Sequence, residues 1–140
     1  MTAAADRFSD ARAHLELLMP ADQAVPGWRG LEPEQRWAWF QAVYEQAAHL
    51  DRRYRLGLRS GWWEDDVQVE ILATLGAWVA MFDYANWTDP EGKARLILQL
   101  PSVRELLRGG AQQFDSDRDR DPFEGHIRDH LGCRESNDVR

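Results

Sequence analysis

The sequence has few of the features that covalent cross-links or membrane anchors require. A single cysteine, Cys133, stands among the 140 residues, so no internal disulfide can form, and this favours a reducing compartment. The longest strongly apolar stretch, residues 71–82, is too short to span a bilayer. Asp6 and Arg7 stand where a secretory signal needs an apolar core. Together these absences predict a soluble cytoplasmic protein that does not enter membranes.

Lysine is nearly absent as well, since sixteen of the 17 basic residues are arginine and Lys93 is the exception. With the abundant alanine and glycine, this bias is typical of a GC-rich coding genome and indicates a bacterial source. The formal net charge is −7, whereas general nucleic-acid binding relies on lysine and arginine to neutralise phosphates. We therefore expect no general nucleic-acid binding, although a local basic patch is compatible with this charge.

Common catalytic signatures are also missing. The chain has no GxSxG elbow, no phosphate-binding P-loop, no GxGxxG after a strand and no HExxH. Two carboxylates are the remaining candidates for acid–base catalysis. Asp51 falls in the apolar arc of one predicted helix and Glu70 on the alanine side of the next, and a buried carboxylate can have a raised pKa. Pairing with Arg36, Arg55 or Arg95 is the simpler interpretation, so we expect neither a catalytic site nor a cofactor.

Apolar residues recur at helical spacing along most of the chain, and no run alternates as a strand would. The pattern predicts an all-α fold, a compact bundle of four main helices with short accessory helices. The expected helices cover residues 4–19, 33–56, 64–84 and 88–100, then 102–108 after an interruption at Pro101, and finally a short C-terminal stretch.

These elements suggest a division of the chain into residues 1–110 as the bundle core, 111–121 as a charged linker, 122–133 as a short C-terminal helix and 134–140 as a flexible tail. Residues 115–121, "DSDRDRD", place carboxylates at alternate positions as a calcium loop does. Arg120, however, stands where that loop needs glycine. A solvated linker is the prediction here.

The stretch "RSGWWEDD", residues 59–66, combines two tryptophans with three acids. The acids lie where the first turn of a helix favours negative charge, so they predict a helix start. The helix that follows is apolar nearly all round, which is typical of the centre of a bundle. One wide arc includes Val67, Ile71, Leu72, Leu75, Trp78, Val79 and Phe82, and the opposite side carries Ala73, Ala77 and Ala80, which would allow another helix to approach closely. Trp63 shares an edge with the apolar arc and is predicted to be buried in the core. Trp62 points about 100° away and is predicted to be exposed.

An arginine cluster adjoins these tryptophans. Arg52, Arg53, Arg55 and Arg59 gather around Tyr54, Trp62 and Trp63. Arginine with aromatic rings can hold a phosphate, a carboxylate or an acidic partner through bidentate hydrogen bonds and stacking. The same charges could instead complement the helix C-terminus and the nearby acids.

A weaker pattern, "HIRDHLGC", lies near the C-terminus. His126 and His130 are four residues apart and could face one metal ion, with Cys133 close behind and Asp129 or Glu124 to complete the site. No paired CxxC motif accompanies them, and His130 could simply pack on the apolar face of its helix. We therefore assign no metal to this chain, with these residues as weak candidates.

The excess of tryptophan suggests a function. Seven are many for a bundle of this size, and exposed Trp and Arg side chains tend to anchor interfaces. The leading hypothesis is a non-enzymatic protein-interaction or regulatory module, with Trp28, Trp62 and Trp87 as anchors and either an unknown protein or a second copy as partner. One alternative is an anionic small molecule bound at the Arg52–Arg59 and Trp62 segment. Another is an acidic inhibitor of phage or plasmid type that mimics nucleic acid, which would require the acids to gather on one face.

Overall fold

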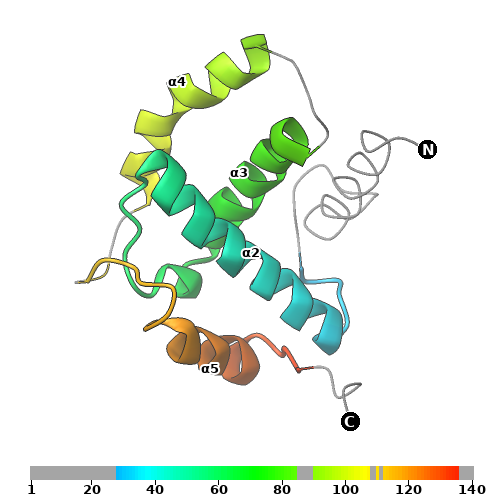
Figure 1. Cartoon of the computed structure of the whole chain (residues 1–140). Helices are drawn as coiled ribbons and strands as arrows, with labels where there is room; N and C mark the ends of the chain where they lie inside the picture. Colours follow the sequence, from blue (N-terminus) through cyan, green and yellow to red (C-terminus); the bar gives the residue numbers. More distant parts are fainter. Residues whose placement is uncertain (1–27, 85–89, 108–109, 111, 136–140) are drawn as a thin grey trace.

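The computed structural model describes residues 28–84, 90–107, 110 and 112–135 (Figure 1). Four α-helices and one 3-10 turn form this part of the chain, and it contains no strand, only an isolated bridge between Arg59 and Gln113. The elements in order are α2 (Pro33–Tyr54), η1 (Trp62–Glu64), α3 (Asp66–Tyr84), α4 (Pro90–Leu106) and α5 (Arg120–His130). The all-α prediction is confirmed. The helix expected over 4–19, and Trp87, lie outside the described residues.

Helix α2 begins at Pro33, as predicted, because proline suits the first turn and the Gln35 side chain accepts a hydrogen bond from the Glu32 N–H at 3.1 Å. It ends at Tyr54, two residues before the expected end, because Arg55 adopts a left-handed conformation with φ of 53°. The guanidinium of Arg104 donates to the carbonyl oxygens of Tyr54 and Arg55 at 2.7 and 3.1 Å. Helix α4 therefore supplies the partners for this helix end.

The acid triplet does open α3, although the geometry is finer than the sequence suggests. Glu64 belongs to the 3-10 turn η1, and the α-helix begins at Asp66. Asp65 lies between them, and its carboxylate accepts hydrogen bonds from the Val67 N–H at 2.9 Å and from the Gln68 side chain at 3.2 Å. The predicted helix start is confirmed, with Asp65 as the capping residue.

The small residues of α3 face α2, which crosses it closely (Figure 1). Ala73 and Ala77 are buried, and a Cβ placed on Gly76 would lie 3.3 Å from the Cβ of Gln46. Side chains larger than these would hold the two helices apart. The predicted close approach of another helix along this side is therefore confirmed for the described residues, and α2 is that helix.

An aromatic cluster fills the centre of the molecule and contains Trp62, which is only 1% exposed. Its ring centroid lies 5.9 Å from that of Phe114, 6.2 Å from that of Phe123 and 6.1 Å from that of Tyr44. The prediction of an exposed Trp62 is wrong, whereas the prediction of a buried Trp63 is confirmed. Trp62 lies in a 3-10 turn after Gly61 rather than on a long helix, and residues from distant parts of the chain cover it.

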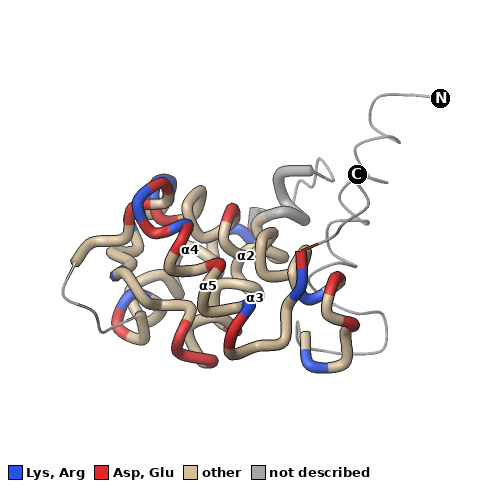
Figure 2. Tube along the Cα trace, turned by 90° about the horizontal axis from the view of Figure 1, so that it is seen from below, with Lys and Arg blue, Asp and Glu red and all other residues tan. Residues whose placement is uncertain are grey.

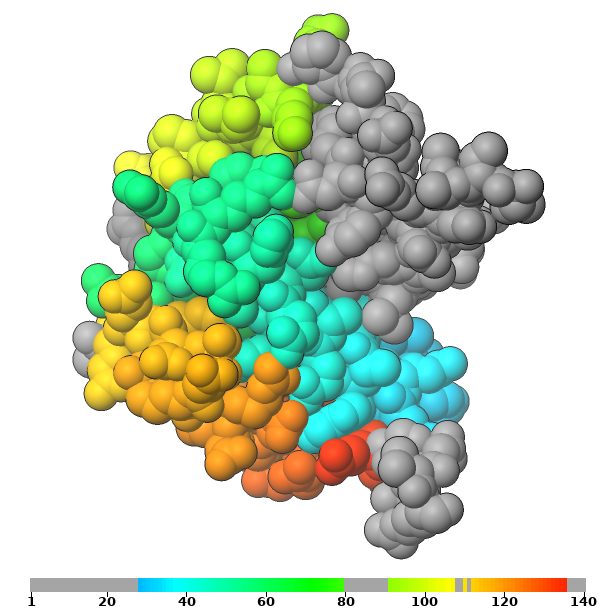
Figure 3. All heavy atoms as spheres, viewed as in Figure 1, coloured from blue at the N-terminus to red at the C-terminus, as the bar shows by residue number. Residues whose placement is uncertain are grey.

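The segment expected to be a solvated linker is one of those distant parts. Phe114 and Asp119 are buried, and the backbone pairs with the loop before η1 through Ser60 N–H to Gln112 O and Phe114 N–H to Leu58 O, each at 2.9 Å. In Figure 3 this segment and α5, both in orange, lie directly against α2. Most side chains of residues 115–121 are exposed, as a solvated segment requires, but Asp119 and the neighbouring Phe114 are buried, which the sequence did not predict.

Asp119 holds this segment by an inward-facing carboxylate. One of its oxygens accepts hydrogen bonds from the Ser60 hydroxyl at 2.6 Å and from the Asp115 N–H at 3.2 Å, and the other from Arg118 at 3.0 Å. Burial by itself would raise the pKa of Asp119, but these hydrogen bonds outweigh it and lower the pKa below the ordinary value.

A pH dependence of stability follows. Because the pKa of Asp119 is lowered in the folded state, its contribution is complete above the unfolded pKa of roughly 4 and is lost as the pH falls through the folded pKa. We expect Asp119→Asn to weaken folding at pH 7, by about 1–3 kcal/mol, and to reduce the loss of stability on acidification. Urea unfolding at pH 7 and pH 3 measures both effects. Asp117→Asn, at an exposed position of the same turn, is the matched control and should retain the wild-type acid dependence; equal behaviour of the two variants would contradict the assignment.

Helix α4 runs without interruption from Pro90 to Leu106, so the break expected at Pro101 is wrong. Proline removes the hydrogen bond to the carbonyl four residues earlier, which is that of Ile97. Both Pro101 and Ile97 are exposed, so this carbonyl lies on the side of α4 that faces solvent. Leu96 and Leu100 are buried on the other side, as is Leu107 directly after the helix, and these contacts hold α4 against the core.

Candidate functional site

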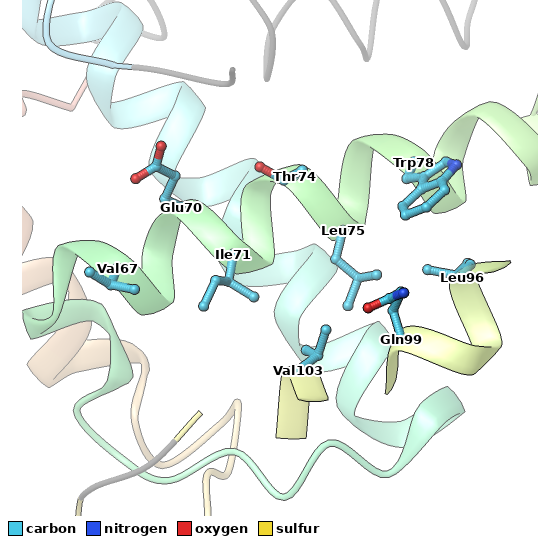
Figure 4. A pocket seen from close by; sticks show the side chains of 9 residues that line it. All are labelled: Val67, Glu70, Ile71, Thr74, Leu75, Trp78, Leu96, Gln99 and Val103. Atoms are coloured by element: carbon cyan, nitrogen blue, oxygen red, sulfur yellow. The ribbon is translucent and has the colours of Figure 1, made fainter. Parts of the chain in front are cut away.

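An apolar groove lies between α3 and α4 (Figure 4). It encloses about 270 Å³ and its walls are mostly hydrocarbon. Helix α3 contributes one wall and α4 the other. Ile71 and Leu75 of α3 point toward Val103 of α4, whereas Glu70 and Thr74 point away from α4. The lining residues are Val67, Glu70, Ile71, Thr74, Leu75, Trp78, Leu96, Gln99 and Val103.

The α3 wall follows directly from the helical repeat. Val67, Ile71 and Leu75 are spaced by four residues and Trp78 follows three later, so all four lie along one side of the helix. This stripe covers twelve residues, and the rise from the first to the last corresponds to about 16 Å or three turns. The groove is therefore long enough to receive several turns of a second helix.

The sequence pattern placed the whole apolar arc of α3 in the core, but in the structure one part of this arc is buried and another part is exposed to solvent. Leu72, Leu75 and Val79 are buried, whereas Val67 is 58% exposed and Ile71 is half-buried. Among the described helices, α2 covers the alanine side of α3 and α4 lies against the other side, where it leaves the groove open. The hydrophobic pattern of α3 could not distinguish a covered stripe from an uncovered one.

The apolar surface continues beyond the groove on α4. Leu106 comes three residues after Val103, on the adjacent turn, and is 59% exposed. The polar residues of the lining are few. Glu70 on α3 is its ionisable residue, and Thr74 on α3 and Gln99 on α4 are neutral polar residues. A groove of this chemistry favours an apolar occupant with a cation or a hydrogen-bond donor at one edge.

The four arginines proposed as an anion site are all exposed. Arg53 places its guanidinium 5.1 Å from the centroid of the Tyr54 ring, and Arg59 bridges to Gln113. Arg52 and Arg55 remain on the same end of α2. Since Trp62 is buried, it offers no stacking surface beside this cluster, and binding of an anionic ligand there stays a prediction.

Trp28 and Trp87 are the other two tryptophans that were proposed as interface anchors. Trp28 is half-buried and packs against Phe40, with ring centroids 5.2 Å apart, while Arg29 and Arg36 lie over its ring. It is therefore already part of an internal contact. Trp87 lies outside the described residues.

The candidate metal ligands do not converge. The rings of His126 and His130 have centroids 5.1 Å apart, but Cys133 is buried elsewhere, with its sulfur 4.0 Å from the carbonyl oxygen of Leu131. Burial raises the pKa of the Cys133 thiol to about 11, which disfavours the thiolate that binds metals. Across residues 28–84, 90–107 and 112–135, no three His, Cys, Asp or Glu side chains form a group that could hold a metal ion.

Neither candidate catalytic carboxylate has the predicted surroundings. The Asp51 carboxylate accepts hydrogen bonds from the N–H groups of Gly57 and Leu58 at 3.0 and 3.1 Å. These two bonds fix the loop that follows α2, and both donors are backbone groups, not arginine side chains. Glu70 is exposed and lines the edge of the groove.

Charges of both signs alternate along the chain, as Figure 2 shows, and do not separate onto opposite sides of the described trace. An acidic inhibitor that mimics nucleic acid would need its carboxylates on one face, so this distribution gives that hypothesis no support. None of the described helices is long and apolar enough to cross a membrane.

Comparison with known proteins gives no relative from which a function could be transferred. No family model, no curated protein and no solved structure matches the chain significantly. The class of protein that the fold defines is an all-α domain with an open apolar groove, and its function has to be argued from that groove.

Proposed function

We propose that this chain is a protein-interaction module that binds an amphipathic helix of a partner polypeptide in the α3–α4 groove. The observation that carries this proposal is a hydrocarbon-walled groove, three turns long, that leaves Val67 and Leu106 exposed at its margins. Large exposed apolar surfaces on a soluble domain commonly mark interaction sites. Insertion of an amphipathic helix into a groove is a recurrent way to cover them.

The groove also specifies the pattern that a partner helix would need. Apolar side chains repeated at intervals of three and four residues would pack against Ile71, Leu75 and Val103. A lysine or arginine at one edge of that stripe could pair with Glu70. The partner would therefore be an apolar-faced helix with a basic residue at its margin.

A polar small molecule or a catalytic substrate fits less well. Such sites usually combine an apolar pocket with several converging polar groups, whereas Glu70 is the sole charged residue in this lining and is exposed. The shape and chemistry thus favour a polypeptide over a metabolite.

Selection of displayed peptides on the full-length protein tests the proposal. The library would hold 16-residue peptides, and the selection would be counter-screened against Ile71→Glu. We expect the enriched peptides to share apolar residues at positions i, i+4 and i+7 and to bind as helices. Enrichment of peptides without this spacing, or of peptides that bind Ile71→Glu equally well, would contradict the proposal.

A further inference from the structure

We infer that the α3–α4 groove binds its partner helix in one direction, which is set by Glu70 and Arg95 at opposite ends and opposite edges of the groove. The partner would therefore carry a basic residue near one end of its apolar stripe and an acidic residue near the other. This inference rests on the proposed function, because it further specifies the partner of the same groove. It draws on the positions and the pairing of these two exposed charges.

Glu70 provides the negative charge at the Val67 end of the groove. It is exposed, comes three residues after Val67 and points away from α4, so it lies on the outer edge of the α3 wall (Figure 4). Asp66, one turn earlier, is already paired with Arg29 at 3.0 Å. Glu70 is therefore the carboxylate that a basic residue of a bound helix would meet at this end.

Arg95 provides the positive charge at the other end and on the other edge. Figure 4 shows Leu96 beside Trp78, at the end of the groove farthest from Val67. Arg95 directly precedes Leu96 and stands one turn before Gln99, so it lies along the outer edge of the α4 wall. Its side chain is 67% exposed, so an occupant of the groove can reach it.

The contact that Arg95 makes within its own helix leaves it able to bind a second carboxylate. Its Nη2 donates a hydrogen bond to Glu91, four residues earlier, at 3.0 Å. Both side chains are mostly exposed, and ion pairs of this kind contribute little to stability. The guanidinium carries further N–H donors, which can bind a carboxylate of the partner.

The diagonal placement of the two charges gives the groove a direction. From Glu70 to Trp78, which lies beside Leu96, α3 rises about 12 Å, or just over two turns. A helix turned end for end keeps its apolar stripe against the walls but exchanges its two ends and its two edges. Its basic residue would then meet Arg95 and its acidic residue would meet Glu70. Both contacts would change from attraction to repulsion, so one direction is favoured.

The size of this preference follows from the exposure of both charges. An exposed ion pair strengthens binding by about 1.5- to 5-fold, and a contact between like charges weakens it by a similar factor. Two attractive contacts in one direction and two repulsive contacts in the other predict a preference of about tenfold at low salt. The preference should fall as added salt screens the charges.

Two designed 16-residue helical peptides of identical composition test this inference. Both carry leucines at positions i, i+4, i+7 and i+11, a pattern that is the same when it is read in either direction. The first peptide has a lysine near its N-terminus and a glutamate near its C-terminus, placed so that both reach the groove charges in one direction of binding. In the second peptide these two residues are exchanged. A nitroxide at the peptide N-terminus reports the direction by broadening methyl signals of the full-length protein.

We expect the two peptides to bind in opposite directions. The nitroxide of the first peptide should broaden the methyl signals of Val67, and that of the second peptide should broaden those of Leu96. In the double variant Glu70→Lys with Arg95→Glu, both assignments should reverse, because the charges of the groove are exchanged while its walls are unchanged.

The matched control is the double variant Asp117→Lys with Arg128→Glu. It makes the same charge changes at exposed positions outside the groove lining, so both peptides should keep their wild-type directions. Two results would overturn the inference, namely equal broadening at both ends of the groove and a direction that stays the same when the peptide charges are exchanged. In either case binding in the groove, and with it the proposed function, would stand. If neither peptide broadens the groove methyls, the proposed function fails as well.

Discussion

Replacing Trp62 with alanine should lower the free energy of unfolding by about 3–5 kcal/mol. Domains of this size are usually stable by only about 5–15 kcal/mol, so the variant would be close to unfolding at physiological temperature. The reason is the position of the indole, which is 1% exposed and lies between rings from α2, α5 and the segment around Phe114. Alanine would leave a cavity that these three elements cannot close without moving. Urea denaturation followed by circular dichroism measures the loss.

Trp62→Phe provides the matched control. In the part of the chain that the structure describes, the indole N–H of Trp62 is buried and has no hydrogen-bond partner, so phenylalanine removes no such bond and keeps most of the ring volume. We expect a loss of about 1–2 kcal/mol, from the smaller ring alone. A loss below 1 kcal/mol for Trp62→Ala would instead place this side chain on the surface, as its position beside Trp63 in the sequence suggests.

The second large effect concerns binding. Ile71→Glu should weaken the affinity for a selected helical peptide by about 100-fold or more, because the bound peptide would bury a carboxylate against hydrocarbon. Ile71 is half-buried in the free protein and lies in the middle of the α3 wall, so a glutamate there can still reach solvent when the groove is empty. The fold should therefore survive with a modest loss of stability. Isothermal titration calorimetry gives the affinity, and thermal unfolding checks the fold.

Leu98→Glu is the control for this experiment. Leu98 is 75% exposed and points away from the side of α4 that carries Leu96, Gln99 and Val103. The same change of charge at that position should leave peptide affinity within about twofold. Equal weakening by both substitutions would indicate a general charge effect and contradict binding in the groove.

The helices of this protein follow from local sequence signals. Pro33 and the Glu32–Gln35 pair define the start of α2, and the acids after Trp63 define the start of α3. These features depend on residues within one turn of each other, which is why periodicity and capping rules predict them. The end of α2 was harder to predict from the sequence, because the hydrogen-bond donor to its last carbonyl groups is Arg104, far along the chain.

The features that sequence reasoning missed depend on residues far apart in the chain. Trp62 is buried because Phe114 and Phe123 return to cover it. Asp119 is buried because Ser60, 59 residues earlier, supplies a donor. The groove has the same origin. The spacing of Val67 and Ile71 identifies an apolar stripe, but the stripe does not show where α4 lies, and in the described part of the chain α4 leaves part of it uncovered.

The most direct measurement of the central proposal is a methyl chemical-shift map of the full-length protein with a selected helical peptide. Binding in the groove predicts that the largest shifts fall on Ile71, Leu75 and Val103, on both walls, while the methyls of Leu98 stay unchanged. Shifts confined to residues outside the α3–α4 groove, such as those near the arginines at the end of α2, would contradict it.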